Sequence, residues 1–470
     1  MWNISTILKT TDDRKTAVLY GDKRLSYGEL KERINATYSD LRKIVKKGDR
    51  IVLKLPNTPE LIINSYAIGE IGAISVPISH LLKQRETEEI VDDVKANVII
   101  SDGGLKVIGE DRETDLDKEV GMIFYTSGVT GSPKGVAHTK DTILTTCQTE
   151  GDLLGIREDD VISGTAPLSF TYGFGALAVV PFLFNTTVSL LEHEPSQKKM
   201  PEILETIERD KVTVFYSTPT TYRLMLKMPQ RYDLSSLRLL ITAGEPMGIG
   251  LYRRLKMLLP HAEVVEHFGC TESFHAIISN KPGNVKPGSL GLELPCYQVR
   301  VLCEEGKECP HGVFGKLAFR GPAGRYLKND KEKEWHYTGD IVYRDSEGYV
   351  WYVARSDEMI KTSGYLVSPH EVENILMEHQ AVSGVVVVGI PDTMLGQKLK
   401  AFIVLEDTYK PSEELKDELK GFLIAQMADY KVPSDIEIIS SIQKSDRGKI
   451  LRKKVLTNKL FKYKGKIDDL

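Results

Sequence analysis

The stretch YTSGVTGSPKG spans residues 125–135 and holds three glycines, four serines or threonines and one lysine. The apolar run VGMIF at 120–124 predicts a buried strand before it, and the Gly-rich composition then predicts a turn. Glycine lets several backbone N–H groups converge on an anion, hydroxyl side chains add donors, and Lys134 adds a compact positive charge. We therefore expect a strand followed by a loop that binds a polyphosphate.

This loop differs from the usual phosphate loop of nucleotide hydrolases. In the pattern G-x-x-x-x-G-K-[ST], a hydroxyl follows the lysine and binds Mg²⁺. Here Pro133 precedes Lys134, and Gly135 follows it. The spacing argues against a P-loop kinase. At this point a Gly/Ser-rich turn without any ligand is the simpler alternative.

Length and composition indicate an ordinary globular protein. The chain has 470 residues, of which 41% are hydrophobic and 27% are charged, and its net charge is −4. A chain of this length is expected to form about two or three domains. The small net charge gives no indication that the protein binds nucleic acid or an anionic membrane.

No segment is predicted to cross a membrane or to direct secretion. The longest apolar stretch, residues 175–184, is shorter than the roughly 20 residues that span a bilayer, and Pro181 interrupts it. The first residues, MWNISTILKTTDDRK, lack the basic start and apolar run of a secretory signal. We therefore expect a cytoplasmic protein.

The cysteines suggest neither disulfides nor zinc. Five cysteines form an odd and sparse set, which predicts no disulfide framework. Cys303, Cys309 and His311 lie close together but lack the paired C-x-x-C spacing of a zinc site. We interpret this segment as a hairpin.

Hydrophobic patterns along the chain predict layered α/β structure. Up to about residue 100, amphipathic helices alternate with apolar strands, and Ser26 with Glu29 forms the pattern of a helix capping box. From about residue 290, short strands and turns predict a β-rich subdomain. After Asp357, the order helix, strand, strand, helix and strand predicts a compact α+β unit of about 110 residues, with Ser412 as a helix cap.

Four further stretches place small polar and charged residues at the ends of predicted strands, where α/β sheets bind ligands. They read AGEP at 243–246, HFGCTE at 267–272, YTGD at 337–340 and KSDRGKILRKK at 444–454. An aromatic ring can stack on a base, and a carboxylate near phosphates can bind Mg²⁺. Each stretch alone is also explained as a turn, a packed aromatic or a surface lysine. Their joint presence in this order favours a nucleotide site.

Together these stretches resemble the adenylate-forming superfamily of acyl- and aryl-CoA ligases, peptide-synthetase adenylation domains and beetle luciferases. YVARSDEMIKTSGYLVSPHEVE at 352–373 resembles the interdomain hinge of that family, so the match covers nearly the whole chain in order. TESFHAIISNKPGNVKPGSLG at 271–291 and SFTYGFG at 169–175 look most like benzoate-CoA ligases.

The resemblance implies two domains. A large N-terminal AMP-binding domain of layered α/β sheets would span residues 1–356, with the β-rich subdomain at about 290–356. A small, mobile α+β domain would span residues 357–470.

The resemblance also implies roles for individual residues. ATP and AMP would be bound by Thr126, Ser127, Gly128, Thr130, Gly131, Lys134, Ala243, Gly244, Glu245, His267, Phe268, Gly269, Thr271, Asp340, Arg355 and Lys449. The catalytic residues would be Lys449, Glu272, Thr271 and Lys134, with Glu272 as the Mg²⁺ ligand. The acid would be bound by Tyr172, Gly173, Phe274, His275 and Lys361, with Asp357 as the hinge and Gly364 in the thiol channel.

The implied reaction has two half-reactions in one site. A carboxylate attacks the α-phosphorus of ATP and gives an acyl-AMP and pyrophosphate, an encounter of like charges that needs cations. Rotation of the small domain about Asp357 would then remove Lys449 and bring in the Gly364 region, and the CoA thiolate would attack the acyl-AMP. The resemblance thus implies an ATP- and Mg²⁺-dependent acid–CoA ligase.

The identity of the acid and of the acceptor is less constrained. Tyr172, Phe274 and His275 favour an aryl, benzoate-like acid, although these rings would equally suit a hydrophobic core. The main alternative is an enzyme that loads a small or medium-chain acyl group onto the phosphopantetheine of a carrier protein. A binding protein without catalysis is disfavoured because Lys449, Glu272 and Asp340 are all present. No feature points to the luminophore of a luciferase.

Overall fold

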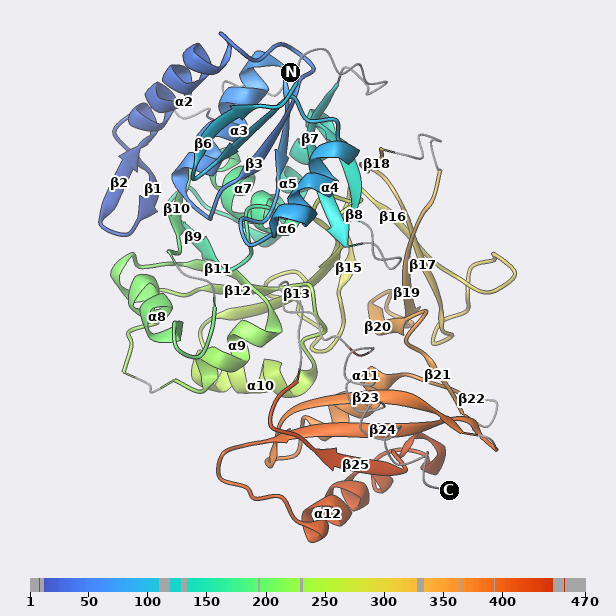
Figure 1. Ribbon diagram of the computed structural model, residues 1–470. Coiled ribbons are helices and arrows are strands. Elements are labelled where there is room, and N and C mark those ends of the chain that lie inside the picture. Colours follow the sequence, from blue (N-terminus) through green and yellow to red (C-terminus); the bar gives the residue numbers. More distant parts are fainter. Residues whose placement is uncertain are drawn as a thin grey trace, which may run out of the picture.

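The computed structural model contains a large α/β body and a smaller C-terminal lobe, which is orange to red in Figure 1. It describes residues 8, 12–109, 119–127, 133–192, 195–228, 231–327, 334–362, 365–392, 394–442 and 452. The layered α/β class predicted from the sequence is confirmed. Within the described part of the chain, no helix is both long and apolar enough to cross a membrane.

A nine-stranded sheet forms one half of the body, in the order β15-β14-β13-β12-β11-β9-β10-β1-β2. Its strands are β1 (Thr16–Tyr20), β2 (Lys23–Ser26), β9 (Val161–Gly164), β10 (Thr187–Leu190), β11 (Val214–Ser217), β12 (Leu239–Thr242), β13 (Glu263–Gly269), β14 (Ala276–Ser279) and β15 (Leu292–Glu293). The run from β1 through β10, β9, β11 and β12 to β13 is parallel, and β2, β14 and β15 add antiparallel pairs at the two ends.

A seven-stranded sheet forms the other half, in the order β18-β8-β7-β4-β3-β5-β6. Its strands are β3 (Arg50–Lys54), β4 (Ile74–Pro77), β5 (Val98–Ser101), β6 (Gly104–Val107), β7 (Val120–Ser127), β8 (Pro133–Thr139) and β18 (Arg325–Tyr326). Successive residues of a strand point to opposite faces. Accordingly Ile51 and Leu53 of β3 join the core shared by both sheets, whereas Val52 joins a second core on the other face.

Helices cover the faces of both sheets. They are α2 (Tyr27–Leu41), α3 (Pro59–Ile71), α4 (Gln84–Asp93), α5 (Lys140–Leu154), α6 (Thr171–Phe174), α7 (Val180–Leu183), α8 (Met200–Arg209), α9 (Pro219–Leu226) and α10 (Ile249–Leu258), with the π-helical turn η1 (Gly175–Val179) between α6 and α7. The predicted capping box of α2 is confirmed. Glu29 N–H donates to Ser26 Oγ at 3.2 Å, and Ser26 N–H donates to Glu29 Oε2 at 2.7 Å.

The predicted β-rich segment is a four-stranded antiparallel sheet in the order β16-β17-β19-β20. Its strands are β16 (Gln298–Leu302), β17 (Gly315–Arg320), β19 (His336–Arg344) and β20 (Val350–Arg355). Cys303 and Cys309 lie in the connection between β16 and β17 and form a disulfide with a Cα–Cα distance of 5.3 Å. The expectation that the cysteines form no disulfides was therefore wrong at this pair. The total number of cysteines does not indicate whether two of them form a local disulfide across a hairpin.

The C-terminal lobe has its own sheet and its own core. Its strands are β21 (Ile360–Thr362), β22 (Tyr365–Val367), β23 (Val382–Asp392), β24 (Gly396–Leu405) and β25 (Asp435–Ile438), and its helices are α11 (Pro369–Leu376), α12 (Glu413–Ile424) and the 3₁₀ turn η2 (Asp429–Lys431). Ser412 caps α12 as predicted, accepting the Leu415 N–H at 3.1 Å. Among the described residues, the core of the lobe, which includes Val372, Val387 and Leu419, is built only from residues of the lobe itself.

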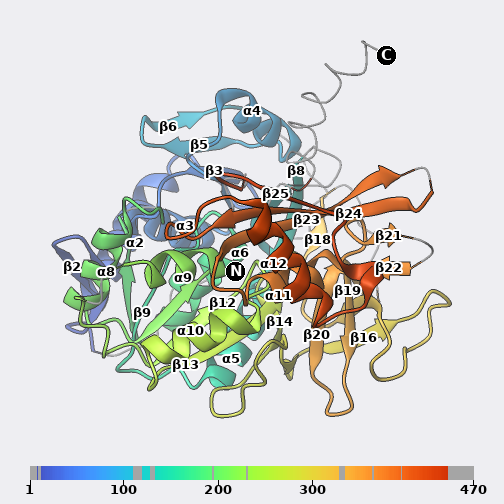
Figure 2. The same cartoon turned by 90° about the horizontal axis from the view of Figure 1, so that it is seen from below.

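Few polar contacts join the lobe to the body near α9 and α10. Glu406 of the lobe lies 3.7 Å from Lys227 Nζ and 3.9 Å from Arg254 Nη1. A Cβ on Gly248 would lie 3.0 Å from Asn374 Oδ1, so α10 and α11 approach closely. The view from below in Figure 2 shows the lobe lying across this part of the body.

Candidate active site

The candidate site lies where the carboxyl ends of β9, β11, β12 and β13 meet. These strands are parallel neighbours, so their carboxyl ends share one edge of the nine-stranded sheet. Ligands of α/β proteins bind at such edges. The segments 243–246 and 267–272 follow or end β12 and β13, and the topology therefore brings the predicted adenine and Mg²⁺ segments together.

The adenine segment is held by α9. Ala243 is buried, and Gly244 has a φ of +85°, which favours glycine. The Thr220 hydroxyl donates to Glu245 Oε1 and Oε2 at 2.9 and 2.8 Å. Arg223 Nη1 lies 3.7 Å from Glu245 Oε2. These contacts from one helix fix the carboxylate of Glu245.

Strand β13 directs its predicted site residues to two faces. It pairs with β14, so that His267 lies opposite Ser279 and Phe268 lies opposite Ile278. Neighbouring side chains of a strand point to opposite faces. His267 is 2% exposed, whereas Phe268 is half-buried against the core of the β-rich segment. Gly269 ends the strand opposite Ala276.

The segment after β13 contacts the phosphate hairpin through Tyr326. The Tyr326 hydroxyl donates to Glu272 Oε1, and Gly324 N–H donates to the Glu272 carbonyl at 2.7 Å. Thr271 and Glu272 are both partly exposed. Tyr326 belongs to β18, which pairs with β8 opposite Val136. Sequence reasoning missed Tyr326, because a tyrosine in a two-residue strand carries no local pattern.

The phosphate segment is a hairpin, and Lys134 stands in its second strand rather than in a loop. Strands β7 and β8 are antiparallel, with Thr126 opposite Lys134 and Ser127 opposite Pro133. The residues after Lys134 explain this pairing, because 135–138 form a second buried run. Lys134 itself is exposed. The predicted residues Gly128, Thr130 and Gly131 lie outside the described part of the hairpin.

Residues 337–340, which the resemblance predicts to bind the ribose, contain a buried acid held by an arginine. Asp340 of β19 lies opposite Arg355 of β20. Arg355 Nη1 lies 3.0 Å from both carboxylate oxygens of Asp340 and 2.9 Å from the Thr338 carbonyl. Asp340 is 4% exposed. Asp357, the predicted hinge, is exposed in the connection between β20 and β21.

Two of the predicted acid-binding residues lie side by side. Tyr172 of α6 and His275 have ring centres 5.3 Å apart, and His275 Nε2 lies 3.0 Å from the Tyr172 carbonyl. Gly173 follows Tyr172, and a Cβ at this position would lie 2.1 Å from the Pro167 carbonyl oxygen. Only glycine therefore fits this turn.

Phe274 and Lys361, which were also predicted to bind the acid, lie elsewhere. Phe274 is fully buried in the core, with its ring centre 5.7 Å from that of Phe124 and 5.3 Å from that of His138. Lys361 is exposed on β21 of the C-terminal lobe, opposite Leu366. The structure therefore does not bring Phe274 or Lys361 into the group of side chains around Tyr172.

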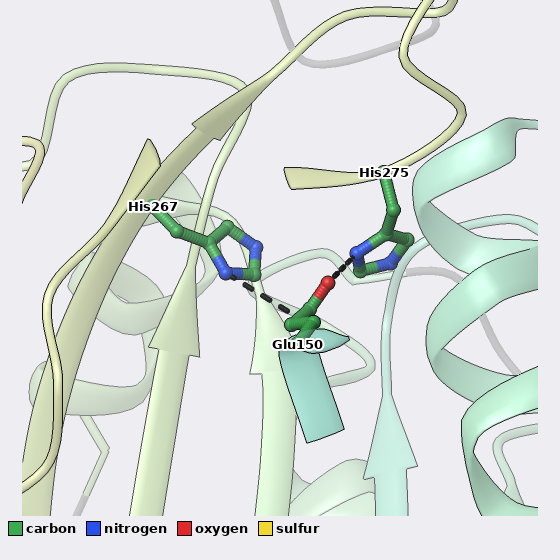
Figure 3. Close-up of side chains that lie close together, drawn as sticks. All are labelled: Glu150, His267 and His275. Carbon is green, nitrogen blue, oxygen red and sulfur yellow. Dashed lines mark hydrogen bonds and ion pairs between the residues drawn. The ribbon is translucent and has the colours of Figure 1, made fainter. Parts of the chain in front are cut away.

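A buried polar cluster, which consists of Glu150, His267 and His275, lies beside Tyr172. Figure 3 shows Glu150, from α5, between the two imidazole rings. Glu150 Oε2 contacts His275 Nδ1, and Glu150 Oε1 lies 3.8 Å from His267 Nδ1. Their ligand atoms lie within 4.8 Å of one another. Sequence reasoning missed Glu150.

Burial and charge act in opposite directions on this cluster. Burial alone would raise the pKa of Glu150, but the neighbouring His275 and His267 and a hydrogen bond from Tyr216, at 3.3 Å, lower it. Burial lowers the pKa of His267 to about 4, against a smaller opposing effect of Glu150. At neutral pH, Glu150 is thus a carboxylate and His267 is a neutral imidazole.

Glu266, the residue before His267, predicts a pH dependence of stability. It is 4% exposed, its Oε1 accepts the Met247 N–H at 2.9 Å, and its Oε2 has no hydrogen-bond partner among the described residues. Burial raises its pKa from 4.5 to about 8. Between these two pH values the folded protein binds more protons than the unfolded chain, so the free energy of unfolding falls as pH rises.

We expect Glu266→Gln to reduce this fall in the free energy of unfolding with pH. The glutamine carbonyl can still accept the Met247 N–H, but the side chain carries no charge at any of these pH values. At about 1.4 kcal/mol per pKa unit, the fall in unfolding free energy between pH 5 and pH 8 should shrink by a few kcal/mol. Urea unfolding at both pH values measures it. Glu263→Gln, three residues earlier on the same strand, is the control. Parallel pH profiles of the wild type and Glu266→Gln would contradict the expectation.

Arg452 is a buried cation of the C-terminal lobe. Its guanidinium donates to both carboxylate oxygens of Glu373 and, at 2.9 Å, to the Val387 carbonyl, and its Nε lies 3.3 Å from Glu358 Oε2. Burial alone would raise the pKa of Glu373, but Arg452 and His370 lower it to about 2. Lys449, three residues before Arg452, and Gly364 lie outside the described residues.

Known proteins resemble the chain along most of its length. The family described as AMP-binding enzyme matches residues 8–121 and 109–325, and the AMP-binding enzyme C-terminal domain matches residues 371–449. The chain is 34% identical to 4-hydroxybutyrate–CoA ligase 1 of Metallosphaera sedula, over 93% of this chain and 86% of that protein. It is 36% identical to the benzoate–CoA ligase of Thauera aromatica, over 71% of this chain and 64% of that protein.

Solved structures agree with these similarities. The anthranilate CoA ligase AuaEII in complex with anthranoyl-AMP superimposes with a TM-score of 0.89 at 31% identity, and the match covers 97% of each chain. A benzoate CoA ligase from Burkholderia xenovorans LB400 superimposes with a TM-score of 0.84 at 29% identity, over 95% of this chain and 98% of that one.

Proposed function

This chain belongs to the AMP-binding enzyme family and is an AMP-forming acid–CoA ligase, and we propose that its acid is an aryl acid of the benzoate kind. ATP and CoA are its co-substrates. The choice of acid rests on the side chains around Tyr172. The rings of Tyr172, Tyr216, His267 and His275 lie with centres 5.3 to 6.4 Å apart.

This ring group is the observation that carries the proposal. It lies at the carboxyl edge of the nine-stranded sheet, beside the adenine segment, and Tyr172 is its partly exposed member. Flat rings that meet edge to face suit an aromatic guest. The names of the anthranilate and benzoate CoA ligases among the similar structures support the same class of acid.

In the first half-reaction, an oxygen of the acid bonds to the α-phosphorus of ATP, the bond from that phosphorus to the bridging oxygen breaks, and pyrophosphate leaves. The approach of a carboxylate to a triphosphate is repulsive, so positioned cations lower the barrier. Lys134, on β8, and Lys449, from the C-terminal segment, are proposed for this task. Asp340, held by Arg355, is proposed to accept hydrogen bonds from the ribose hydroxyls.

The residues present suit a magnesium ion. Mg²⁺ is bound in phosphate sites by one or two carboxylates together with phosphate oxygens. Glu272 offers one partly exposed carboxylate, and the Tyr326 hydroxyl ties it to the strand beside the phosphate hairpin. When bound there, Mg²⁺ would offset the negative charge of the phosphates. Thr271, next to Glu272, is proposed to contact the same nucleotide.

The second half-reaction transfers the acyl group to sulfur. The CoA thiolate bonds to the carbonyl carbon of the acyl-AMP, and AMP leaves. We propose that residues 357–470 rotate about Asp357 between the two half-reactions, removing Lys449 and bringing Gly364 to the thiol. The separate core of the lobe supports this division from residues 1–356, because a rotation then exposes no shared apolar core.

A substrate panel tests the aryl proposal. With ATP and CoA present, benzoate and substituted benzoates should release pyrophosphate about tenfold or more faster, as kcat/KM, than hexanoate or octanoate, because a few misplaced contacts cost 1–3 kcal/mol. A coupled pyrophosphate assay measures this. Fatty acids that turn over faster than all benzoates would contradict the proposal and leave the acid–CoA ligase activity in place.

A measurement of AMP release under the same conditions distinguishes CoA from a carrier protein as the acceptor of the acyl group. AMP release that depends on CoA, in the absence of any other protein, identifies CoA as the acceptor. The relatives named above are CoA ligases, so the carrier-protein alternative has no support from them.

A further inference from the structure

We propose that the acid substrate carries a hydroxyl or amino group, which His267 and Glu150 of the buried polar cluster hold by hydrogen bonds. The inference rests on the proposed function of this site and names a chemical feature of its substrate. It starts from a residue whose ring nitrogens have no hydrogen-bond partner among the described residues. That residue is His267, which is 2% exposed.

The bonding of His275 is complete. Its Nδ1 faces the Glu150 carboxylate, and its Nε2 lies 3.0 Å from the Tyr172 carbonyl. The Tyr172 carbonyl only accepts hydrogen bonds, so His275 Nε2 donates to it, and the contact with Glu150 occupies Nδ1. Tyr216 adds a second hydrogen bond to Glu150, at Oε1.

The bonding of His267 is not complete. Neither of its ring nitrogens has a hydrogen-bond partner within the described residues. The neutral imidazole offers one N–H donor and one lone pair. Leaving such a group buried and unpaired costs about 1–3 kcal/mol. A ligand that satisfies both nitrogens, or one of them, would recover this cost.

The distance between His267 and Glu150 fits a bridging group. His267 Nδ1 and Glu150 Oε1 are 3.8 Å apart, which is too long for a direct hydrogen bond. One hydroxyl oxygen placed about 2.8 Å from each can donate to Glu150 Oε1 and accept the Nδ1–H of His267, and an amino group can donate to both atoms. A methyl group of the same size would leave His267 without a hydrogen-bond partner, while Glu150 Oε1 would keep only its bond from Tyr216.

The tyrosine rings beside His267 suit the ring of an aryl acid. The rings of Tyr172 and Tyr216 have centres 5.5 and 6.4 Å from that of His267. His267 precedes Phe268 on β13, and the adenine segment follows the neighbouring strand β12. An acid whose hydroxyl or amino group binds His267 therefore directs its carboxylate along the ends of the strands, toward the predicted nucleotide segments.

A metal ion is the competing occupant, because two histidines and a carboxylate are common metal ligands. In the structure the Glu150 carboxylate faces His275 Nδ1 directly, and His267 Nδ1 lies 3.8 Å from Glu150 Oε1. The metal content of the purified enzyme distinguishes the two occupants.

The experiment compares acids that differ only in one substituent. Benzoates with a hydroxyl, amino or methyl group at ring positions 2, 3 and 4 are assayed with ATP and CoA, together with 4-hydroxybutyrate and pentanoate. We expect kcat/KM of the hydroxy or amino acid to exceed that of the matched methyl acid by at least on the order of 10²-fold at one ring position. His267→Phe should reduce this ratio to near one, and the exposed-site control His261→Phe should keep it.

The outcomes separate this inference from the proposed function. Benzoates that react at similar rates whatever their substituent overturn the inference and leave the aryl ligase in place. A preference for 4-hydroxybutyrate over pentanoate that is lost in His267→Phe, with no aryl acid turned over, supports the inference and overturns the aryl proposal. A stoichiometric transition metal in the purified enzyme, lost in Glu150→Gln, overturns the inference. The wild-type ratios decide the matter even where a variant fails to fold.

Discussion

Lys449→Ala is expected to slow acyl-AMP formation by about 10²- to 10³-fold and to leave the transfer of a supplied acyl-AMP to CoA near the wild-type rate. A single positioned cation that stabilises developing charge contributes about this much to a rate. The repulsion between the carboxylate of the acid and the triphosphate arises only in the first half-reaction. The second half-reaction joins a thiolate to a neutral carbonyl, and in the proposed rotation Lys449 has left the site by then.

The two half-reactions are measured separately. Pyrophosphate exchange with ATP and acid reports adenylation, and AMP release from synthetic acyl-AMP and CoA reports transfer. Lys453→Ala, four residues away in the same basic run, is the matched control and should leave both rates near the wild-type values. An equal loss in both half-reactions of Lys449→Ala would show that the lysine supports folding or general binding rather than adenylation.

Arg452→Met is expected to give the largest loss of stability. Removing one partner of a buried ion pair leaves the other charge unpaired in a medium of low polarity, which costs about 3–5 kcal/mol. Glu373 would be that charge, since it is 5% exposed and its pKa is held near 2 chiefly by Arg452 against the effect of burial. Val387 N–H would remain as a hydrogen-bond donor to Glu373, at 2.7 Å, and His370 Nδ1 would remain 3.1 Å from Glu373 Oε2, but the two-pronged guanidinium contact would be lost.

Urea unfolding of the full chain measures this effect, through a probe in the C-terminal lobe. The double variant Arg452→Met/Glu373→Leu should recover most of the loss, because it removes both charges and fills the space with apolar atoms. Arg85→Met is the surface control, since Arg85 pairs with Glu89 at 3.1 Å but its side chain is 89% exposed. A single Arg452 variant as stable as the Arg85 variant would contradict the buried pair.

Local patterns in the sequence predicted the elements that depend on near neighbours. The capping box of Ser26 and Glu29 is a pattern of residues three apart, and both of its hydrogen bonds are present. The strand before the phosphate segment was likewise predicted from one apolar run, which lies in β7. The hairpin was missed because its second strand contains Pro133 and Gly135, which are residues typical of turns.

Contacts between distant residues could not be predicted in this way. Glu150 and His275 are 125 positions apart, so their contact follows from the packing of α5 against β14 and the residue before it. The sequence holds one indirect signal. Glu150 stands among Thr146, Cys147 and Leu154 on the buried face of α5, and an acid on such a face needs a partner. The burial of Arg452 could not be predicted either, because Arg452 belongs to a run of basic residues and such a run usually lies on a solvated surface.

The contact of Glu406 with Lys227 and Arg254 has a consequence for the energetics of catalysis. The three side chains keep 25% to 47% of their exposure, and the atoms are 3.7 and 3.9 Å apart. Ion pairs that water reaches contribute about 0–1 kcal/mol each. Breaking these two ion pairs therefore costs little more than thermal energy, and dissolved salt weakens them further.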